Sequence, residues 1–158
     1  MLILFGAGLI LLIVISVLAW TSTSRARAAD EALEDVRQSL SIPQDWTVVT
    51  DEARTSGFLG LCFSTAMDVR ACPSQTLAYS LEEVPSSVSA LQEVLPGADW
   101  ASGETDCAAV PANVSGRFGT CTAATSAQGF RIEVSAEVEA SQGGSVKDPR
   151  VIITIVPE

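Results

Sequence analysis

The chain has 158 residues with 19 acidic side chains, nine basic ones and no histidine, so its formal net charge is −10 and its pI is about 4.3. A negative field of this strength repels phosphates and argues against a nucleic-acid partner. Without histidine, the commonest general base and the usual serine and cysteine hydrolase arrangements are absent. No phosphate-binding loop, dinucleotide fingerprint or nucleophile elbow is present, and we expect a protein that is not an enzyme and holds no cofactor.

The chain opens with an apolar run, residues 1–20, in which Ser16 is the only polar side chain. At about 1.5 Å per residue, a helix of this length spans roughly the 30 Å hydrocarbon core of a bilayer. Trp20 stands where an aromatic residue would lie at the membrane–water boundary. We therefore expect residues 1–20 to form a transmembrane anchor whose partner is the membrane lipid bilayer.

A cleavable signal peptide is the alternative interpretation of this run. Signal peptides begin with a basic segment and have a shorter apolar core of about 7–15 residues, and neither property is found here. The segment Ala26-Arg27-Ala28 does match the small-x-small pattern that precedes a cleavage site. Cleavage near Ala28 would release the rest of the chain as a secreted protein.

Residues 21–42 are predicted to join the anchor to the remaining chain. Thr21–Ala28 is a Ser/Thr/Arg/Ala tether, and residues 29–40 carry an apolar side chain every three or four positions. This spacing predicts an amphipathic helix that stops before Pro43. Its polar face is mainly acidic, which favours packing on the following domain, or a stalk, over lying on a membrane surface.

Two signals conflict over the side of the membrane on which the large domain lies. Arg25, Arg27 and Arg37 follow the apolar run, and the positive-inside rule would place them in the cytoplasm. The four cysteines of the chain, Cys62, Cys72, Cys107 and Cys121, favour an oxidising compartment instead. We expect a single-pass protein of the cell membrane, with its C-terminal domain extracytoplasmic.

The cysteines permit three disulfide pairings. Close spacing favours Cys62–Cys72 and Cys107–Cys121, each joining neighbouring strands, and in the loop-entropy model each contributes roughly 3 kcal/mol. Four buried reduced thiols in a cytoplasmic domain are the alternative. No pair has the C-x(2–4)-C spacing of a zinc site, histidine is absent, and we expect no metal.

Residues 43–158 are predicted to form one disulfide-stapled α+β domain. Alternating and β-branched segments predict strands, and Pro85-Ser86-Ser87 predicts the start of a helix that ends at Pro96-Gly97. The predicted strands are 46–50, 58–63, 71–81, 106–110, 117–124, 130–139 and 151–156, with a loop at 141–145. In 130–139 one face is apolar and the other acidic, whereas 151–156 is almost wholly apolar and is expected to be central and buried on both faces. The fold class is α+β, a curved antiparallel sheet packed against one or two helices.

Trp46 and Trp100 each follow a predicted helix and lead toward a predicted strand. Packing at helix–strand corners is the favoured interpretation, and an aromatic recognition surface that makes both candidate binding residues is the alternative. Three acidic pairs could serve an enzyme or bind Ca²⁺, although chance explains such pairs in a chain with 19 acids. They are Asp51/Glu52, Glu82/Glu83 and Glu137/Glu139.

These features predict a membrane-anchored, extracytoplasmic, non-catalytic binding or scaffolding domain of the bacterial cell envelope. The bacterial origin is an inference from the Ala- and Arg-rich, Lys-poor composition. A partner in the envelope is expected because a tether concentrates weak contacts beside the membrane. The alternatives are an envelope enzyme that uses carboxylates, and a secreted inhibitor or ligand carrier.

Overall fold

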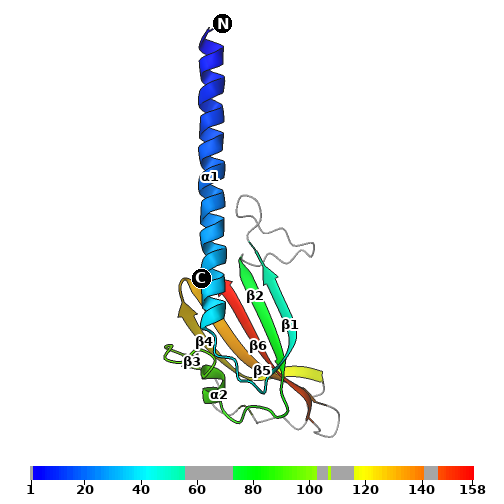
Figure 1. Cartoon of the computed structure of the whole chain (residues 1–158). Coiled ribbons are helices and arrows are strands. Elements are labelled where there is room, and N and C mark those ends of the chain that lie inside the picture. The colour runs from blue at the N-terminus through cyan, green and yellow to red at the C-terminus, as the bar shows by residue number, and fades with distance from the viewer. Residues whose placement is uncertain (1, 56–72, 103–106, 108–115, 141–145) are drawn as a thin grey trace.

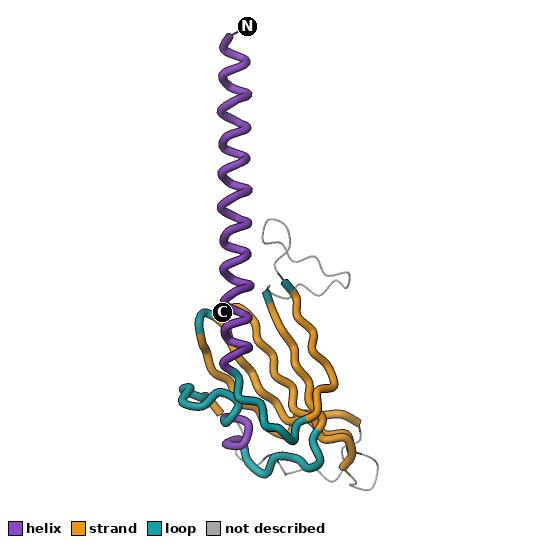
Figure 2. Tube along the Cα trace, in the orientation of Figure 1, coloured by secondary structure: helices purple, strands orange, loops and turns teal. Residues whose placement is uncertain are grey.

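The computed structural model describes residues 2–55, 73–102, 107, 116–140 and 146–158, with side chains described from Leu12 onward except at residues 102 and 146. A long helix stands on a twisted sheet that a second, short helix also covers (Figures 1 and 2). The helices are α1 (Leu2–Ser39) and α2 (Val88–Gln92). The strands are β1 (Thr47–Arg54), β2 (Ser74–Ser80), β3 (Ala101–Ser102), β4 (Gly116–Ala127), β5 (Phe130–Ala140) and β6 (Val146–Pro157).

Helix α1 runs without interruption through the predicted tether, residues 21–28, and therefore joins the apolar run and the amphipathic segment into one rod. No glycine or proline stands between Gly8 and Pro43 to break it. Serine and threonine side chains from residue 16 to 24 bond back to carbonyls three or four residues earlier, so they do not compete with the helix. The tether is helical because its composition, Ala and Arg with satisfied hydroxyls, tolerates a helix.

The strands form one antiparallel sheet in the order β1-β2-β6-β5-β4-β3. The predicted α+β class and antiparallel sheet are confirmed. The strands predicted at 46–50, 117–124, 130–139 and 151–156 are present as β1, β4, β5 and β6, each longer than predicted at one end or both. Consecutive antiparallel neighbours such as β4 and β5 need only the short turn at Gln128-Gly129, where both residues have positive φ.

One face of the sheet carries the hydrophobic core. On β5 the alternation is as predicted: Phe130, Ile132, Val134, Ala136 and Val138 are buried, while the residues between them are exposed or half-buried. The C-terminal turns of α1 and the short helix α2 contribute to the same cluster through Leu33, Val36, Val88, Leu91 and Val94. The opposite face of β5 is the polar, mainly acidic one.

The central position predicted for residues 151–156 is confirmed, because β6 lies between β2 and β5. The prediction that both faces of this strand are buried is wrong in part. Val151, Ile153 and Ile155 are fully buried, whereas Ile152, Thr154 and Val156 are half-buried on the face away from the helices. A register shift opposite Val138 accommodates the Asp148-Pro149 pair in β6, and proline is tolerated at such a bulge.

Helix α2 is shorter than the predicted helix and comprises Val88–Gln92. Ser87 is its N-cap residue, but the Ser87 side chain contacts the Ser89 hydroxyl at 2.7 Å and makes no capping hydrogen bond. The chain after Gln92 continues in single turns to Gly97, whose φ of +80° ends the segment. Two of the residues predicted for its apolar face, Val88 and Leu91, are buried as expected.

Some predictions fall outside the described residues or are changed by the structure. The strand at 58–63 and the loop at 141–145 lie outside the described part of the chain, as does all but Cys107 of the strand at 106–110. Cys107 itself is not in a strand, and β4 pairs with β3 at Ala101 and Ser102 instead. The strand predicted at 71–81 is described from residue 73, and β2 begins at Ser74.

Candidate functional site

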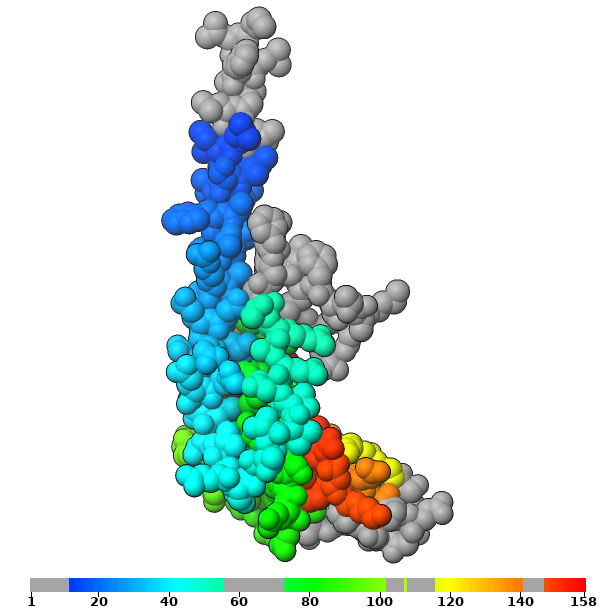
Figure 3. Space-filling view, turned by 45° about the vertical axis from the view of Figure 1, so that its right-hand side comes forward, coloured from blue at the N-terminus to red at the C-terminus, as the bar shows by residue number. Residues whose placement is uncertain are grey.

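The N-terminal half of α1 projects away from the sheet (Figure 1), and from Leu12 to Trp20 it carries exposed apolar side chains. Figure 3 shows this part of α1 standing clear of the sheet. Exposure ranges from 47% at Val14 to 74% at Trp20, and the set consists of Leu12, Ile13, Val14, Ile15, Val17, Leu18 and Trp20. Four consecutive members, residues 12–15, point in four directions because successive residues turn by about 100°. A helix that is apolar all round is one that another apolar phase surrounds.

In the part of the chain whose side chains the structure describes, which begins at Leu12, no helix has a stretch long and apolar enough to cross a membrane. The predicted anchor, residues 1–20, extends over eleven residues on the N-terminal side of that part.

The C-terminal end of α1 is fixed to the sheet by a buried pair and a polar cluster. Leu33 and Val36 lie in the core, and the Arg37 Nη2 atom is 2.6 Å from Asp51 Oδ2 on β1. Gln75 on β2 donates its amide to the other oxygen of Asp51 at 2.8 Å. Three elements therefore meet at one carboxylate, which fixes the rotation of α1 on the sheet.

Directly after α1, the backbone adds a further connection. The Ser41 amide donates to the Val94 carbonyl at 2.7 Å, which links the end of α1 to the segment that follows α2. Leu40 and Ile42 are partly buried against the core on the same side. The predicted amphipathic helix thus packs on the domain, as one of the two alternatives for it expected.

The Cys107–Cys121 disulfide is present, with Cα atoms 4.9 Å apart. It connects a segment outside the sheet to the middle of β4, so the pairing is confirmed but not the expected connection of two strands. Both cysteines are buried in the core. Cys62 and Cys72 lie outside the described residues, and their pairing stays a prediction.

The two candidate binding tryptophans lie at opposite edges of the sheet and do not form one surface. Trp46 immediately precedes β1 and its ring contacts Tyr79, with ring centroids 5.8 Å apart. Trp100 precedes β3 and donates its indole N–H to the Leu95 carbonyl at 3.3 Å. Both are partly buried against the core, which is the corner-packing role that the sequence favours.

The Trp46–Tyr79 contact lies beside the polar cluster of α1. Burial raises the pKa of the Tyr79 phenol, and the negative charge of Asp51 raises it further, while the positive charge of Arg37 acts in the opposite direction. The phenol is therefore neutral throughout the physiological range. Its ring packs against the Trp46 ring at the start of β1.

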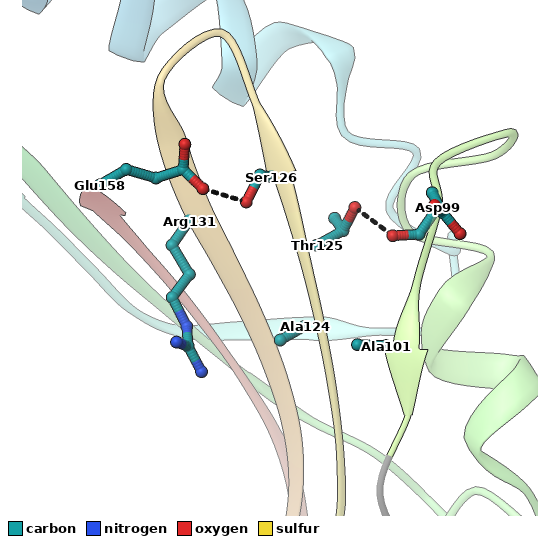
Figure 4. A pocket seen from close by; sticks show the side chains of 7 residues that line it. All are labelled: Asp99, Ala101, Ala124, Thr125, Ser126, Arg131 and Glu158. Atoms are coloured by element: carbon teal, nitrogen blue, oxygen red, sulfur yellow. Dashed lines mark hydrogen bonds between the residues drawn. The ribbon is translucent and has the colours of Figure 1, made fainter.

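An open hollow of about 490 Å³ lies where β3, β4 and β5 end next to the last residue, Glu158 (Figure 4). Ser126 and the Glu158 carboxylate are hydrogen-bonded there, and the Thr125 hydroxyl donates to the Asp99 carbonyl at 2.9 Å. The remaining lining residues are Ala101, Ala124 and Arg131. Sequence reasoning missed this group because its members come from four separate segments and share no motif.

The bulge in β6 is held by an arginine–aspartate cluster. Asp148 accepts from Arg150 at 2.6 Å and from Arg117 of β4 at 2.9 Å, and Arg117 also lies 3.5 Å from Glu139. Hydrogen bonds from Arg150 and Arg117 lower the pKa of the Asp148 carboxyl. The cluster fixes a bulge at which Asp148 has a positive φ of 49°.

The acidic pairs weighed as catalytic or Ca²⁺-binding groups are dispersed in the structure. Asp51 and Glu52 alternate along β1 and so point to opposite faces of the sheet, with Asp51 bound to Arg37. Glu139 is paired with Arg117. Across the described ranges, no group of three or more Cys, Asp or Glu side chains is arranged to hold a metal ion.

Comparison with known proteins adds no relative: no protein-family model, no curated protein and no solved structure matches this chain.

Proposed function

We propose that the protein is a membrane-anchored, extracytoplasmic, non-catalytic domain of the bacterial cell envelope that binds or scaffolds an envelope protein. The observation that carries this proposal is the contrast within α1 between exposed apolar residues around Leu18 and the buried pair Leu33 and Val36. The exposed part extends the apolar run of residues 1–20, and lipid is the phase that would cover such a surface. The docked part makes the domain a direct continuation of the anchor.

The disulfide supports the extracytoplasmic placement. Disulfides persist in oxidising compartments and are rare where thioredoxin and glutathione keep thiols reduced. The Cys107–Cys121 ring closes across 14 residues and joins a buried loop position to a core strand. A domain that uses such a bond for stability belongs outside the cytosol.

The polar chemistry of the domain supports a non-catalytic role. Asp51 is bound to Arg37 of α1 and so connects β1 to that helix. Asp148 is bound to Arg117 of β4 and to Arg150 of its own strand, and so holds the bulge in β6. The hollow beside Glu158 is open and brings a single arginine, Arg131, near two acidic residues. Within this hollow the Ser126 hydroxyl is hydrogen-bonded to the Glu158 carboxylate, a contact that connects β4 to the residue after β6.

The outer edge of β1 is the part of the domain best suited to a protein partner. In the described part of the chain, β1 pairs only with β2, so the backbone groups along its other edge are available to an added strand. Val48 and Val49 are 60% and 45% exposed on this edge strand. An extended segment of an envelope protein would pair here and cover both valines.

The placement is tested by labelling intact cells with a membrane-impermeant maleimide. Because Cys107 and Cys121 are buried, the reporter is Glu93→Cys, an exposed position after α2, and Ser16→Cys inside the predicted anchor is the matched control. We expect labelling of Glu93→Cys in intact cells and none of Ser16→Cys before detergent is added. Labelling of Glu93→Cys only after lysis would overturn the extracytoplasmic placement.

The redox state is read from the same cells. After acid quenching, alkylation in denaturant should leave the native cysteines unmodified unless a reductant is added first. Four thiols that alkylate without reductant would contradict a disulfide-stapled domain. For the partner, Val48→Ser/Val49→Ser should reduce the co-purification of a bound envelope protein, whereas Thr122→Ala, at an exposed position of β4, should not.

A further inference from the structure

Two arginines of α1, Arg25 and Arg27, follow the exposed apolar segment after four hydroxyl residues and are themselves exposed. We propose that they bind the phosphate groups of anionic lipid headgroups, an inference that rests on the proposed membrane anchor. They are the only charged residues between Trp20 and Asp30. This short stretch is therefore locally positive, although the chain as a whole is strongly acidic.

The continuity of α1 sets the height of these arginines above the anchor. Because the helix is unbroken from Leu2 to Ser39, Arg25 and Arg27 lie five and seven residues beyond Trp20, or about 7.5 and 10.5 Å along the axis at 1.5 Å per residue. The headgroup layer on each side of a bilayer is roughly 5–8 Å thick. Arginine side chains reach back over this distance and place their guanidinium groups among the headgroups.

The charges of both arginines are available to a ligand. In the described part of the chain, neither Arg25 nor Arg27 forms an ion pair, whereas Arg37 of the same helix is bound to Asp51 and Glu34. Glu31 stands four residues after Arg27, but an arginine that precedes a glutamate at this spacing has the less favourable orientation. Helix α1 thus carries one ion-paired arginine at its docked end and, in the described part of the chain, two arginines without an ion pair toward its projecting end.

Guanidinium chemistry makes phosphate the matching ligand. The planar fork of arginine binds phosphate through two parallel hydrogen bonds, and its charge attracts an anionic headgroup. Arg25 and Arg27 are separated by about 200° around the helix, so each would contact a different lipid. The contact would also offset the repulsion between an anionic surface and the acidic domain above it.

Native mass spectrometry of the full-length chain in a mild detergent tests the inference. Phosphatidylglycerol, phosphatidylcholine and inorganic phosphate are titrated separately onto the wild type, Arg25→Gln, Arg27→Gln and the double variant. Lys147→Gln is the charge-matched control, because Lys147 is exposed near the start of β6. The start of β6 lies remote from the projecting part of α1 (Figure 1). All changes lie at exposed positions, and near-ultraviolet circular dichroism verifies that the domain stays folded.

We expect the wild type to bind phosphatidylglycerol more tightly than phosphatidylcholine, with a loss of roughly fivefold per arginine and about 25-fold in the double variant. Lys147→Gln should bind like the wild type. Equal affinity for the two lipids, an unchanged double variant, or equally tight binding of inorganic phosphate would each overturn the headgroup site while leaving the anchor in place. Failure to retain either lipid would overturn the proposed anchor itself and the inference with it.

Discussion

The two ends of α1 both carry leucine and valine, but they differ in composition and in environment. Leu18 is 62% exposed on the projecting end, while Leu33, fifteen residues later on the same helix, is 5% exposed in the core. The projecting end is apolar on every side, whereas the docked end is apolar along one stripe that includes Leu33, Val36 and Leu40. The end with a single apolar stripe packs on the sheet, whereas the end that is apolar all round projects from it.

The comparison also shows what a continuous helix does for the domain. The polar cluster of Arg37, Asp51 and Gln75 fixes the docked end in rotation, and the unbroken backbone carries that orientation to the projecting end. The end of the sheet that carries the β4–β5 turn and the C-terminus lies beside α1 (Figure 1). This is the end from which the N-terminal half of α1 projects. If lipid surrounds residues 12–20, that end of the domain faces the membrane.

The largest expected difference between the ends of α1 appears on leucine truncation. Leu33→Ala removes a fully packed side chain and should destabilise the domain by about 2–5 kcal/mol, because a cavity is left between helix and sheet. The matched variant Leu18→Ala should change the unfolding free energy of the domain by less than about 0.5 kcal/mol. Chemical denaturation in detergent, followed by near-ultraviolet circular dichroism, measures both.

Equal destabilisation by the two leucine variants would contradict the distinction between docked and projecting ends. The opposite ranking is expected for retention in membranes. Leu18→Ala reduces the apolar surface offered to lipid, whereas Leu33→Ala leaves that surface unchanged. Carbonate extraction of membranes compares the two variants directly.

The next expected effect concerns the stability of the domain alone and leaves the projecting part of α1 unaffected. Replacing Cys107 and Cys121 by alanine opens a ring across 14 residues and should cost the domain roughly 3 kcal/mol. Since neither cysteine contacts the projecting part of α1, extraction from membranes should not change. Thermal unfolding of wild type and variant, with and without reductant, tests this, and a wild type insensitive to reductant would refute the stabilising role of the bond.

A smaller effect is expected at the polar cluster that orients α1. Arg37 and Asp51 side chains are 40% and 38% exposed, so solvent screens their attraction and the pair should contribute less than about 1 kcal/mol. A double-mutant cycle with Arg37→Gln and Asp51→Asn measures the coupling. Coupling well above that value would show that orientation depends on the ion pair more than on Leu33 and Val36.

The sequence predicted those features whose signal is local and periodic. The alternation in residues 130–139 identified both the strand and its buried face, and the three-to-four spacing of residues 29–40 identified the docked helix. The apolar run of 151–156 indicated a central strand, but run length alone did not reveal that one face is only half-buried. The continuity of α1 was missed because Ser and Thr residues at 21–24 are typical of loops until their hydroxyls bond to the helix itself.

The sequence could not predict features made by residues far apart in the chain. The cluster of Arg117, Asp148 and Arg150 requires β4 and β6 to lie near a bulge, and no spacing in the sequence encodes that approach. The hollow beside Glu158 likewise depends on four segments meeting at one end of the sheet. The disulfide is the exception, because a small spacing between two cysteines makes their pairing probable before the fold is known.

The smallest effect is a pH dependence confined to the bulge in β6, remote from both ends of α1. Because arginines lower the pKa of Asp148 in the folded state, this carboxylate adds stability above its unfolded pKa of 3.8, and the contribution is lost as pH falls through the lower folded value. Asp148→Asn should therefore be less stable than the wild type at pH 7, and the gap should begin to narrow near pH 3.8 and close once pH falls below the folded-state pKa. Asparagine tolerates the positive φ at this position, so the variant removes the charge without straining the backbone. Urea midpoints between pH 7 and pH 2.5 measure the gap, and parallel curves for the two proteins would show that the arginine cluster adds no pH-dependent stability.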